Sequence, residues 1–241
     1  MAYVDPTLPD PTPHNELVPR VAPLRGLAST ATALITANCL LNIATVWSDW
    51  HSYGLASDYV AGDPDVTVAD LNDADSLNVI LTMLFRATYV AAGVMFIVWL
   101  YRARHNSELI NDARHRRSRG WVIGAWFCPV VNLWFPHQIV ADVWRTSDPD
   151  EPPDLYQVAG LPSPPLVRWW WSALLLANVV STWERLGRGP VTLDWFREQA
   201  VVNTISTALL CVAAVLVAPI IRRISEWQAI PRPPRESTRR A

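Results

Sequence analysis

Residues 77–101 read LNVILTMLFRATYVAAGVMFIVWLY, an apolar run of 25 residues that contains one charge, Arg86. A helix of this length is long enough to cross the ~30 Å hydrocarbon layer of a membrane. The next segment, residues 102–119, is strongly basic and carries six arginines. Because short cytoplasmic loops accumulate positive charge, this order predicts a membrane-spanning helix that enters the cytoplasm at its C-terminal end.

Three further apolar runs flank this one, at about residues 27–47, 169–183 and 200–221. The composition of the whole chain agrees with a membrane protein, since 51% of its 241 residues are hydrophobic and only 17% are charged. Soluble domains have about 25% charged residues. We therefore predict an all-α integral membrane protein with four transmembrane helices, which form a single membrane domain over residues 25–221.

The two ends of the chain differ from this domain. Residues 1–24 contain six prolines and few apolar residues, which predicts a disordered, Pro-rich cytoplasmic tail. Residues 222–241 predict a basic cytoplasmic tail. No short basic-then-apolar stretch with a cleavage site begins the sequence, so we expect no cleaved signal peptide.

The segment 121–144 is apolar but does not have the pattern of a span. Its apolar part ends at Trp134, which gives a helix of only ~21 Å, and Pro129 and Pro136 would break or kink it. If the segment returns to the side it came from, sixteen arginines lie in the cytoplasm and three outside; if it crosses, the counts are eleven and eight. We therefore predict a re-entrant or interfacial hairpin, with both termini on the cytoplasmic side of the plasma membrane.

The same region carries a set of short motifs. An Arg-x-Arg-x-Asn segment is followed by Gly-Trp, by a Trp-Phe-x-Pro-x-x-Asn-Leu-x-x-Pro block and by an acidic-x-Trp-Arg end. In these motifs the chain resembles the actinobacterial membrane family catalogued as domain of unknown function 4328. The resemblance implies a membrane fold but no biochemical role, and His105 and His137 depart from the family pattern. The matching positions are Arg102, Arg104, Asn106, Gly120, Trp121, Trp126, Phe127, Pro129, Asn132, Leu133, Pro136, Asp142, Trp144 and Arg145.

Arg86 is the most informative single residue, because it lies nine residues into a predicted span. An unpaired charge at that depth costs at least ~3 kcal/mol, so the side chain should face the bundle interior or water. We expect Arg86 to pair with Glu198, with Asp194 or Glu184 as the next choices. The alternative is an outward-facing site in which Arg86 holds a phosphate or carboxylate group. Polar residues that could extend the network are Asn42, Asn78, Thr82 and Asn203.

Other polar and aromatic groups have structural interpretations. His105, Glu108, Asp112 and His115 share one helix face, to which His137 could add a ligand, but we expect a solvated face and no metal or other cofactor. The three cysteines lack a metal or disulfide spacing and are expected to be buried small side chains. Residues 48–76 contain seven aspartates without the spacing of a calcium loop and are expected to form a solvated outer loop. An interfacial belt is predicted for Trp47, Trp50, Trp99, Trp169, Trp170, Trp171 and Trp183.

Three classes of function remain open. The first is a non-catalytic accessory, sensor or scaffold protein that contacts membrane lipids, with a protein partner bound through the basic C-terminal tail. The second is a membrane-embedded enzyme that acts on a lipid or isoprenoid in a Trp-lined cavity, with Glu198 or Asp194 as the acid. The third is a small transporter whose broken segment, including Asn132, lines a ligand cavity. The net charge of −2 gives no reason to expect nucleic acid.

Overall fold

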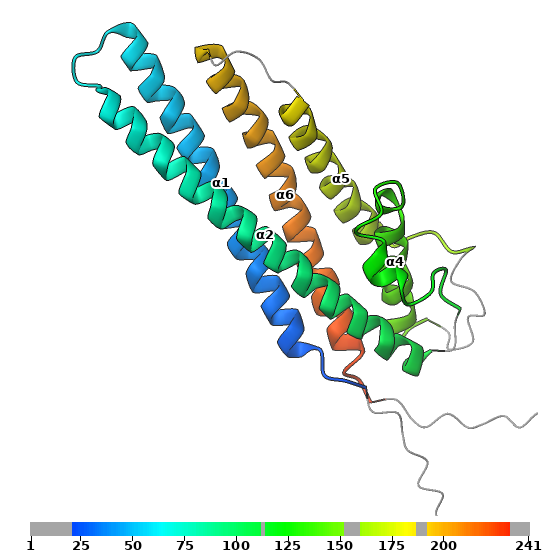
Figure 1. The fold of residues 1–241 in the computed structure, drawn as a ribbon. Coiled ribbons are helices and arrows are strands. Elements are labelled where there is room, and N and C mark those ends of the chain that lie inside the picture. Colours follow the sequence, from blue (N-terminus) through cyan, green and yellow to red (C-terminus); the bar gives the residue numbers. More distant parts are fainter. Residues whose placement is uncertain (1–20, 112–113, 152–159, 187–191, 232–241) are drawn as a thin grey trace, which may run out of the picture.

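The computed structural model describes residues 21–111, 114–151, 160–186 and 192–231. All regular structure in this part of the chain is helical (Figure 1). The elements are α1 (Arg25–Ala61), α2 (Val68–Ile110), α3 (Trp121–Gly124), the 3-10 turn η1 (Val131–Leu133), α4 (Phe135–Ser147), α5 (Pro165–Leu186) and α6 (Leu193–Trp227).

Three of the described helices, α1, α2 and α6, are long and apolar enough to cross a membrane. The predicted all-helical membrane fold is confirmed at this level. With 37, 43 and 35 residues, each of these helices is also much longer than the ~20 residues that a span needs. Each therefore continues beyond the predicted apolar run.

The largest difference from the sequence prediction lies between α1 and α2. The predicted outer loop 48–76 is wrong, because α1 continues to Ala61 and α2 begins at Val68. Gly62 ends α1 in the left-handed conformation, with φ 82°, which glycine adopts without strain. Thr67 begins α2 with a capping box to Asp70. Hydropathy marks where a helix leaves the membrane, whereas these capping residues mark where it ends.

The packing of the long helices defines two ends of the bundle. α1 packs against α2 and α6, and α5 packs against α6 (Figure 1). Near the start of α1, the Asn106 side-chain amide donates to the Ala22 carbonyl at 2.8 Å. The Gln228 amide, just after α6, donates to the Ala103 carbonyl at 2.9 Å. We call this the terminal end of the bundle, and the opposite end, where α1 turns into α2, the hairpin end.

The predicted tails lie largely outside the described residues. Residues 21–24 were assigned to the disordered N-terminal tail, but Ala22 is hydrogen-bonded to Asn106 through both its backbone groups and Leu24 is buried. The ordered domain therefore begins before residue 25. The composition of residues 1–24 could not predict this contact, because the partner, Asn106, is 84 residues away in the sequence.

A cluster of aromatic rings fills the core near the terminal end. Phe96 contacts the rings of Trp126 and Trp170 at centroid distances of 5.8 Å, and Trp126 contacts Trp171 at 6.1 Å. Trp99 is fully buried and donates to the Ser225 hydroxyl. The belt prediction is thus wrong for Trp99, Trp170 and Trp171, because inward-facing and outward-facing tryptophans occur side by side on the same helix; Trp47 and Trp169 are exposed.

The segment 121–144 does not form one continuous helix, as predicted. The short α3 ends before Pro129, and Pro136 lies in the first turn of α4, where its missing N–H costs nothing. The Trp171 indole donates to the Leu133 carbonyl at 2.8 Å, which satisfies a backbone acceptor that the break leaves free. α4 then packs against the terminal-end halves of α2, α5 and α6.

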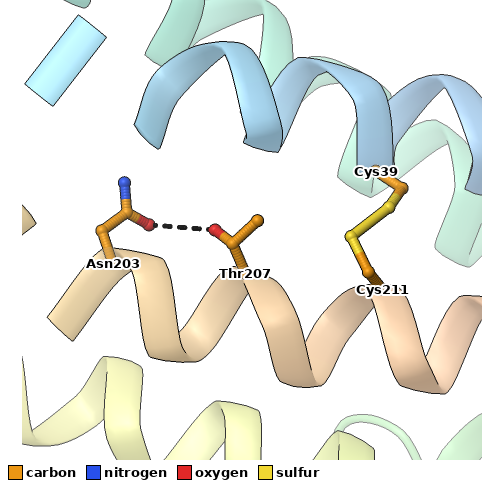
Figure 2. Close-up of a disulfide and its surroundings, with 4 residues drawn as sticks. All are labelled: Cys39, Asn203, Thr207 and Cys211. Atoms are coloured by element: carbon orange, nitrogen blue, oxygen red, sulfur yellow. Dashed lines mark hydrogen bonds between the residues drawn. A yellow bond between two sulfur atoms is a disulfide. The ribbon is translucent and has the colours of Figure 1, made fainter. Parts of the chain in front are cut away.

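A disulfide joins the first and last long helices (Figure 2). Cys39 of α1 and Cys211 of α6 are 172 residues apart in sequence, yet their Cα atoms are 5.8 Å apart, a separation typical of disulfides. The prediction of free buried thiols is wrong for these two residues, because helix packing rather than sequence spacing brought them together. Cys128 is free.

Candidate functional site

A cavity of about 1250 Å³ lies among α1, α2, α5 and α6, in the half of the bundle nearer the hairpin end. Three of its walls are closed by the packing of α1 on α2, α1 on α6 and α5 on α6. α2 and α5 are not among the helix pairs that pack closely, so the fourth side is the most open one. Its polar lining residues are Asn42, Thr45, Asp49, Ser52, Asn72, Asp75, Asn78, Thr82, Arg86, Tyr89, Asn178, Ser181, Trp195, Gln199, Asn203 and Ser206.

Asp49 is the centre of the hydrogen bonding in this cavity. Its two carboxylate oxygens accept from the side-chain amides of Asn78 on α2, at 2.6 Å, and Asn203 on α6, at 2.5 Å. The carboxylate therefore joins three helices. Asp49 has no ion-pair partner among the described residues.

The charge of Asp49 fixes the orientation of the two amides. A carboxylate only accepts, so each amide must turn its NH₂ group toward it and keep its oxygen as a free acceptor. The Asn78 oxygen accepts a hydrogen bond from the Thr82 hydroxyl, and the Asn203 oxygen accepts one from the Thr207 hydroxyl, each at 3.4 Å (Figure 2 shows the second pair). The result is one network in which donors on α2 and on α6 both point toward the carboxylate on α1.

Sequence reasoning placed Asp49 in a solvated loop and missed this role. A signal was present in α1, where the lining residues recur every three or four positions: Asn42, Thr45, Asp49, Ser52 and Ala56. This spacing defines one face of a helix. A polar stripe continuing beyond the apolar run indicates an internal cavity rather than a loop.

Arg86 also lines the cavity, together with the predicted network residues Asn42, Asn78, Thr82 and Asn203. The predicted Arg86–Glu198 ion pair is not formed, and neither residue has an ion pair within the described part of the chain. The reason is the helical rotation of 100° per residue. Gln199 lines the cavity, whereas its neighbour Glu198 is exposed on another face.

The other predicted site residues lie apart from Arg86. Asp194 is exposed near the start of α6 and does not line the cavity. The side chain of Glu184 lies outside the described part. Asn132 belongs to the turn η1 in the broken segment, also away from the cavity, and its Oδ1 atom is buried without a hydrogen-bond partner.

Two buried polar atoms in the cavity wall lack a hydrogen-bond partner. They are Oε1 of Gln199 and Oγ of Ser52. Buried polar atoms in folded proteins are nearly always hydrogen-bonded, to protein or to a bound molecule. Both atoms are themselves buried, so they face the surrounding protein rather than the open space of the cavity.

A second polar cluster lies at the terminal end and involves the motif residues. The Asp142 carboxylate is buried; it accepts the backbone N–H of Arg116 at 2.8 Å and forms an ion pair with the Arg116 guanidinium at 3.2 Å. Burial raises the pKa of Asp142, against the opposing effects of this hydrogen bond and of the nearby arginines. Arg104 is paired with Glu108 at 3.0 Å, and Glu108 also binds Arg119.

The helix face predicted for His105, Glu108, Asp112 and His115 does not form, because α2 ends at Ile110, before the last two of these residues. Glu108 is occupied by two arginines, His105 is exposed, and Asp112 lies outside the described residues. Burial and the charges of Arg116 and Arg168 lower the pKa of His137, which favours its neutral form. No group of three or more His, Cys, Asp or Glu suited to a metal occurs within the described ranges.

Comparison with known proteins gives one match. The family model described as a domain of unknown function, DUF4328, matches residues 62–226. This range contains the motif segment and three of the four helices that line the cavity, α2, α5 and α6. No curated protein and no solved structure matched the chain.

Proposed function

The chain belongs to the DUF4328 family, and we propose that it is a four-span, non-catalytic membrane protein that binds the anionic group of a lipid at Arg86. The observation that carries this proposal is the polar cavity, in which Arg86 has no carboxylate partner among the described side chains. In this role the protein serves as an accessory, sensor or scaffold subunit.

The proposed topology takes α5 as the fourth span. Its 22 residues give a helix of ~33 Å, enough for the hydrocarbon layer, and it lies along α6. With four spans, both described ends of the chain are on one side. The arginine distribution assigns that side to the cytoplasm, and the cavity then opens in the outer half of the membrane.

In this topology the segment 121–144 returns to the cytoplasmic side as an interfacial hairpin. Its tip exposes apolar side chains, with Phe127 75% and Val130 66% exposed. Exposed apolar residues on a turn next to the terminal end of the bundle are suited to the boundary between headgroups and acyl chains. The basic C-terminal tail on the same side remains a proposed contact for anionic lipid or for a protein partner.

Arg86 is suited to hold an anion. A guanidinium at this depth is costly without a counter-charge, and its planar donors match a phosphate or carboxylate in a bidentate arrangement. The catalytic alternative has less support from the geometry. Of the tryptophans whose side chains are described, only Trp195 lines the cavity, and neither Glu198 nor Asp194 does.

Native mass spectrometry of the purified protein tests the proposal. We expect the wild-type protein to retain a phospholipid, and Arg86→Gln to retain at least about tenfold less, since one charged contact is worth ~1.4 kcal/mol or more. The control is Arg197→Gln, because Arg197 is an exposed arginine on α6 that does not line the cavity. Equal lipid retention by all three proteins would contradict the proposal.

A further inference from the structure

We propose that the ligand of this cavity is a zwitterionic phospholipid, whose phosphate binds Arg86 and whose ammonium group binds Asp49. The inference rests on the proposed function and specifies its ligand. It requires that Asp49 and Arg86 follow the order in which a lipid headgroup presents its charges. The other lining carboxylate, Asp75, is exposed and lies nearer the hairpin end than Asp49.

Asp49 has the acceptor capacity to bind an ammonium group. A carboxylate has about four lone-pair positions, and the amides of Asn78 and Asn203 use one on each oxygen. The carboxylate has no cation among the described side chains, although a charge within the bundle is costly without one. An ammonium group has three N–H donors and can use the lone-pair positions of Asp49 that the two amides leave free.

The two charges are offset along the length of the cavity. Asn78, which binds Asp49, precedes Arg86 by eight residues on α2, a rise of ~12 Å. Helical side chains lean toward the N-terminus of their helix. For Arg86 this direction is toward Asn78 and the hairpin end, so the guanidinium and the carboxylate come closer together than the helical rise alone suggests.

The order of the contacts matches a lipid in the outer leaflet. Of the two proposed contacts, Asp49 lies nearer the hairpin end and Arg86 lies deeper; the lining residues beyond Arg86 include the apolar Val90 and Leu210. An outer-leaflet phospholipid presents its ammonium group, its phosphate and its acyl chains in this same order. The weakly packed side between α2 and α5 lets the chains leave the cavity toward the bilayer.

The size of the cavity also favours a lipid over a small soluble molecule. Its volume of about 1250 Å³ exceeds the ~300–1,000 Å³ of usual small-molecule pockets. A free zwitterion such as phosphoethanolamine would satisfy both charges but would leave the deeper apolar wall unfilled.

Binding to defined lipids tests the inference with the full-length protein in detergent. The probes are dioleoyl phosphatidylethanolamine, its N-acetylated form, dioleoyl phosphatidylglycerol and free phosphoethanolamine, measured by native mass spectrometry and by the shift in melting temperature. We expect phosphatidylethanolamine to bind about tenfold more tightly than either phosphatidylglycerol or the N-acetylated lipid, which lack the ammonium charge. Free phosphoethanolamine should bind at least about a hundredfold more weakly, since it buries no acyl chain.

Two variants assign the contacts. Asp49→Asn should abolish the preference for phosphatidylethanolamine over phosphatidylglycerol, whereas Arg86→Gln should weaken the binding of both lipids. The controls are Asp58→Asn and Arg197→Gln, at exposed positions outside the cavity. The comparison with N-acetylated lipid needs no variant, so it remains informative if Asp49→Asn fails to fold.

The outcomes distinguish the two levels of the proposal. Equal binding of all three lipids to the wild-type protein, with weaker binding of phosphatidylethanolamine and phosphatidylglycerol to Arg86→Gln, would overturn the zwitterion and leave the proposed function standing. Unchanged lipid binding in Arg86→Gln would overturn both. Free phosphoethanolamine binding as tightly as the lipid would overturn the assignment to a phospholipid.

Discussion

At the scale of single residues, Asp49 shows how one carboxylate organises three helices. Its two amide partners come from α2 and α6, so each hydrogen bond is also a contact between helices. Hydrogen bonds to a charged group contribute more than neutral ones, and a buried group that loses its partner is left with the cost of desolvation. The stability of the bundle should therefore depend on these amides more than on other amides in the same cavity.

Replacement of one amide tests this dependence. Asn203→Ala should lower the free energy of unfolding by about 1.5–3 kcal/mol, because it removes a donor to a charged carboxylate. Asn178→Ala is the matched control, since Asn178 lines the same cavity but donates only to the Leu174 carbonyl of its own helix. Thermal melting in detergent measures both. Equal effects of the two substitutions would show that Asp49 does not depend on its partners.

His137 gives a prediction for pH. Its pKa is lowered in the folded state by burial and by Arg116 and Arg168, so between that pKa and ~6.5 the unfolded chain binds more protons. The contribution of this group to stability is therefore present above pH ~6.5 and is lost as the pH falls toward the folded-state pKa. His137→Asn should lose less stability than the wild-type protein over this range.

The control for this experiment is His51→Asn, because His51 is exposed on α1 near the hairpin end. Asp142 acts in the opposite direction: its raised pKa adds stability as the pH falls through that value. The comparison between His137→Asn and wild type removes this common contribution. Identical pH profiles for the two proteins would refute the role of His137.

At the scale of elements, the sequence predicts the helices well where hydropathy and proline decide, and poorly where packing decides. The apolar run around Arg86 predicts a helix, and α2 is present there. Pro129 and Pro136 predict that the segment 121–144 is not one helix, and it is interrupted between α3 and α4. The rotation of α6, which turns Gln199 rather than Glu198 into the cavity, depends on contacts with α1 and α5. No local pattern near Glu198 carries that information.

The disulfide between α1 and α6 is an element-scale feature with a direct test. A protease site inserted in the turn 62–67 would divide the chain between Cys39 and Cys211. After cleavage, the two fragments should migrate as one band on a denaturing gel without reductant and as two bands when reductant is added. The fragments of the Cys39→Ser variant should separate with and without reductant. Those of Cys128→Ser, which changes the free cysteine, should behave as the wild-type fragments do.

Loss of this bond should also lower stability. A disulfide that closes a long loop typically contributes about 2–4 kcal/mol, chiefly by restricting the unfolded chain. We expect Cys39→Ser and Cys211→Ser to lower the melting temperature by similar amounts, and the double substitution to add little to either. Additive effects would mean that the two residues act separately and that the bond is not formed.

At the scale of the whole molecule, the position of the cavity in the membrane depends on how many helices cross. The two described ends of the chain meet at the terminal end, and this agrees with an even number of spans. If α5 is the fourth span, the cavity lies in the outer half and receives outer-leaflet lipid. If the segment 121–144 also crosses, α5 and α6 are both reversed relative to α1 and α2, and the contact of Gln228, just after α6, with Ala103 of α2 could no longer form.

Labelling of introduced cysteines decides between these arrangements. In a Cys128→Ser background, cysteines at Ser57 and Arg116 should react with a membrane-impermeant reagent from opposite sides, because one lies near the hairpin end and the other near the terminal end. A cysteine at Ser163, just before α5, should react from the same side as Arg116. Labelling of Ser163 from the outside would show that segment 121–144 crosses the membrane. The arginine distribution makes that result unexpected, since it would place eight arginines outside rather than three.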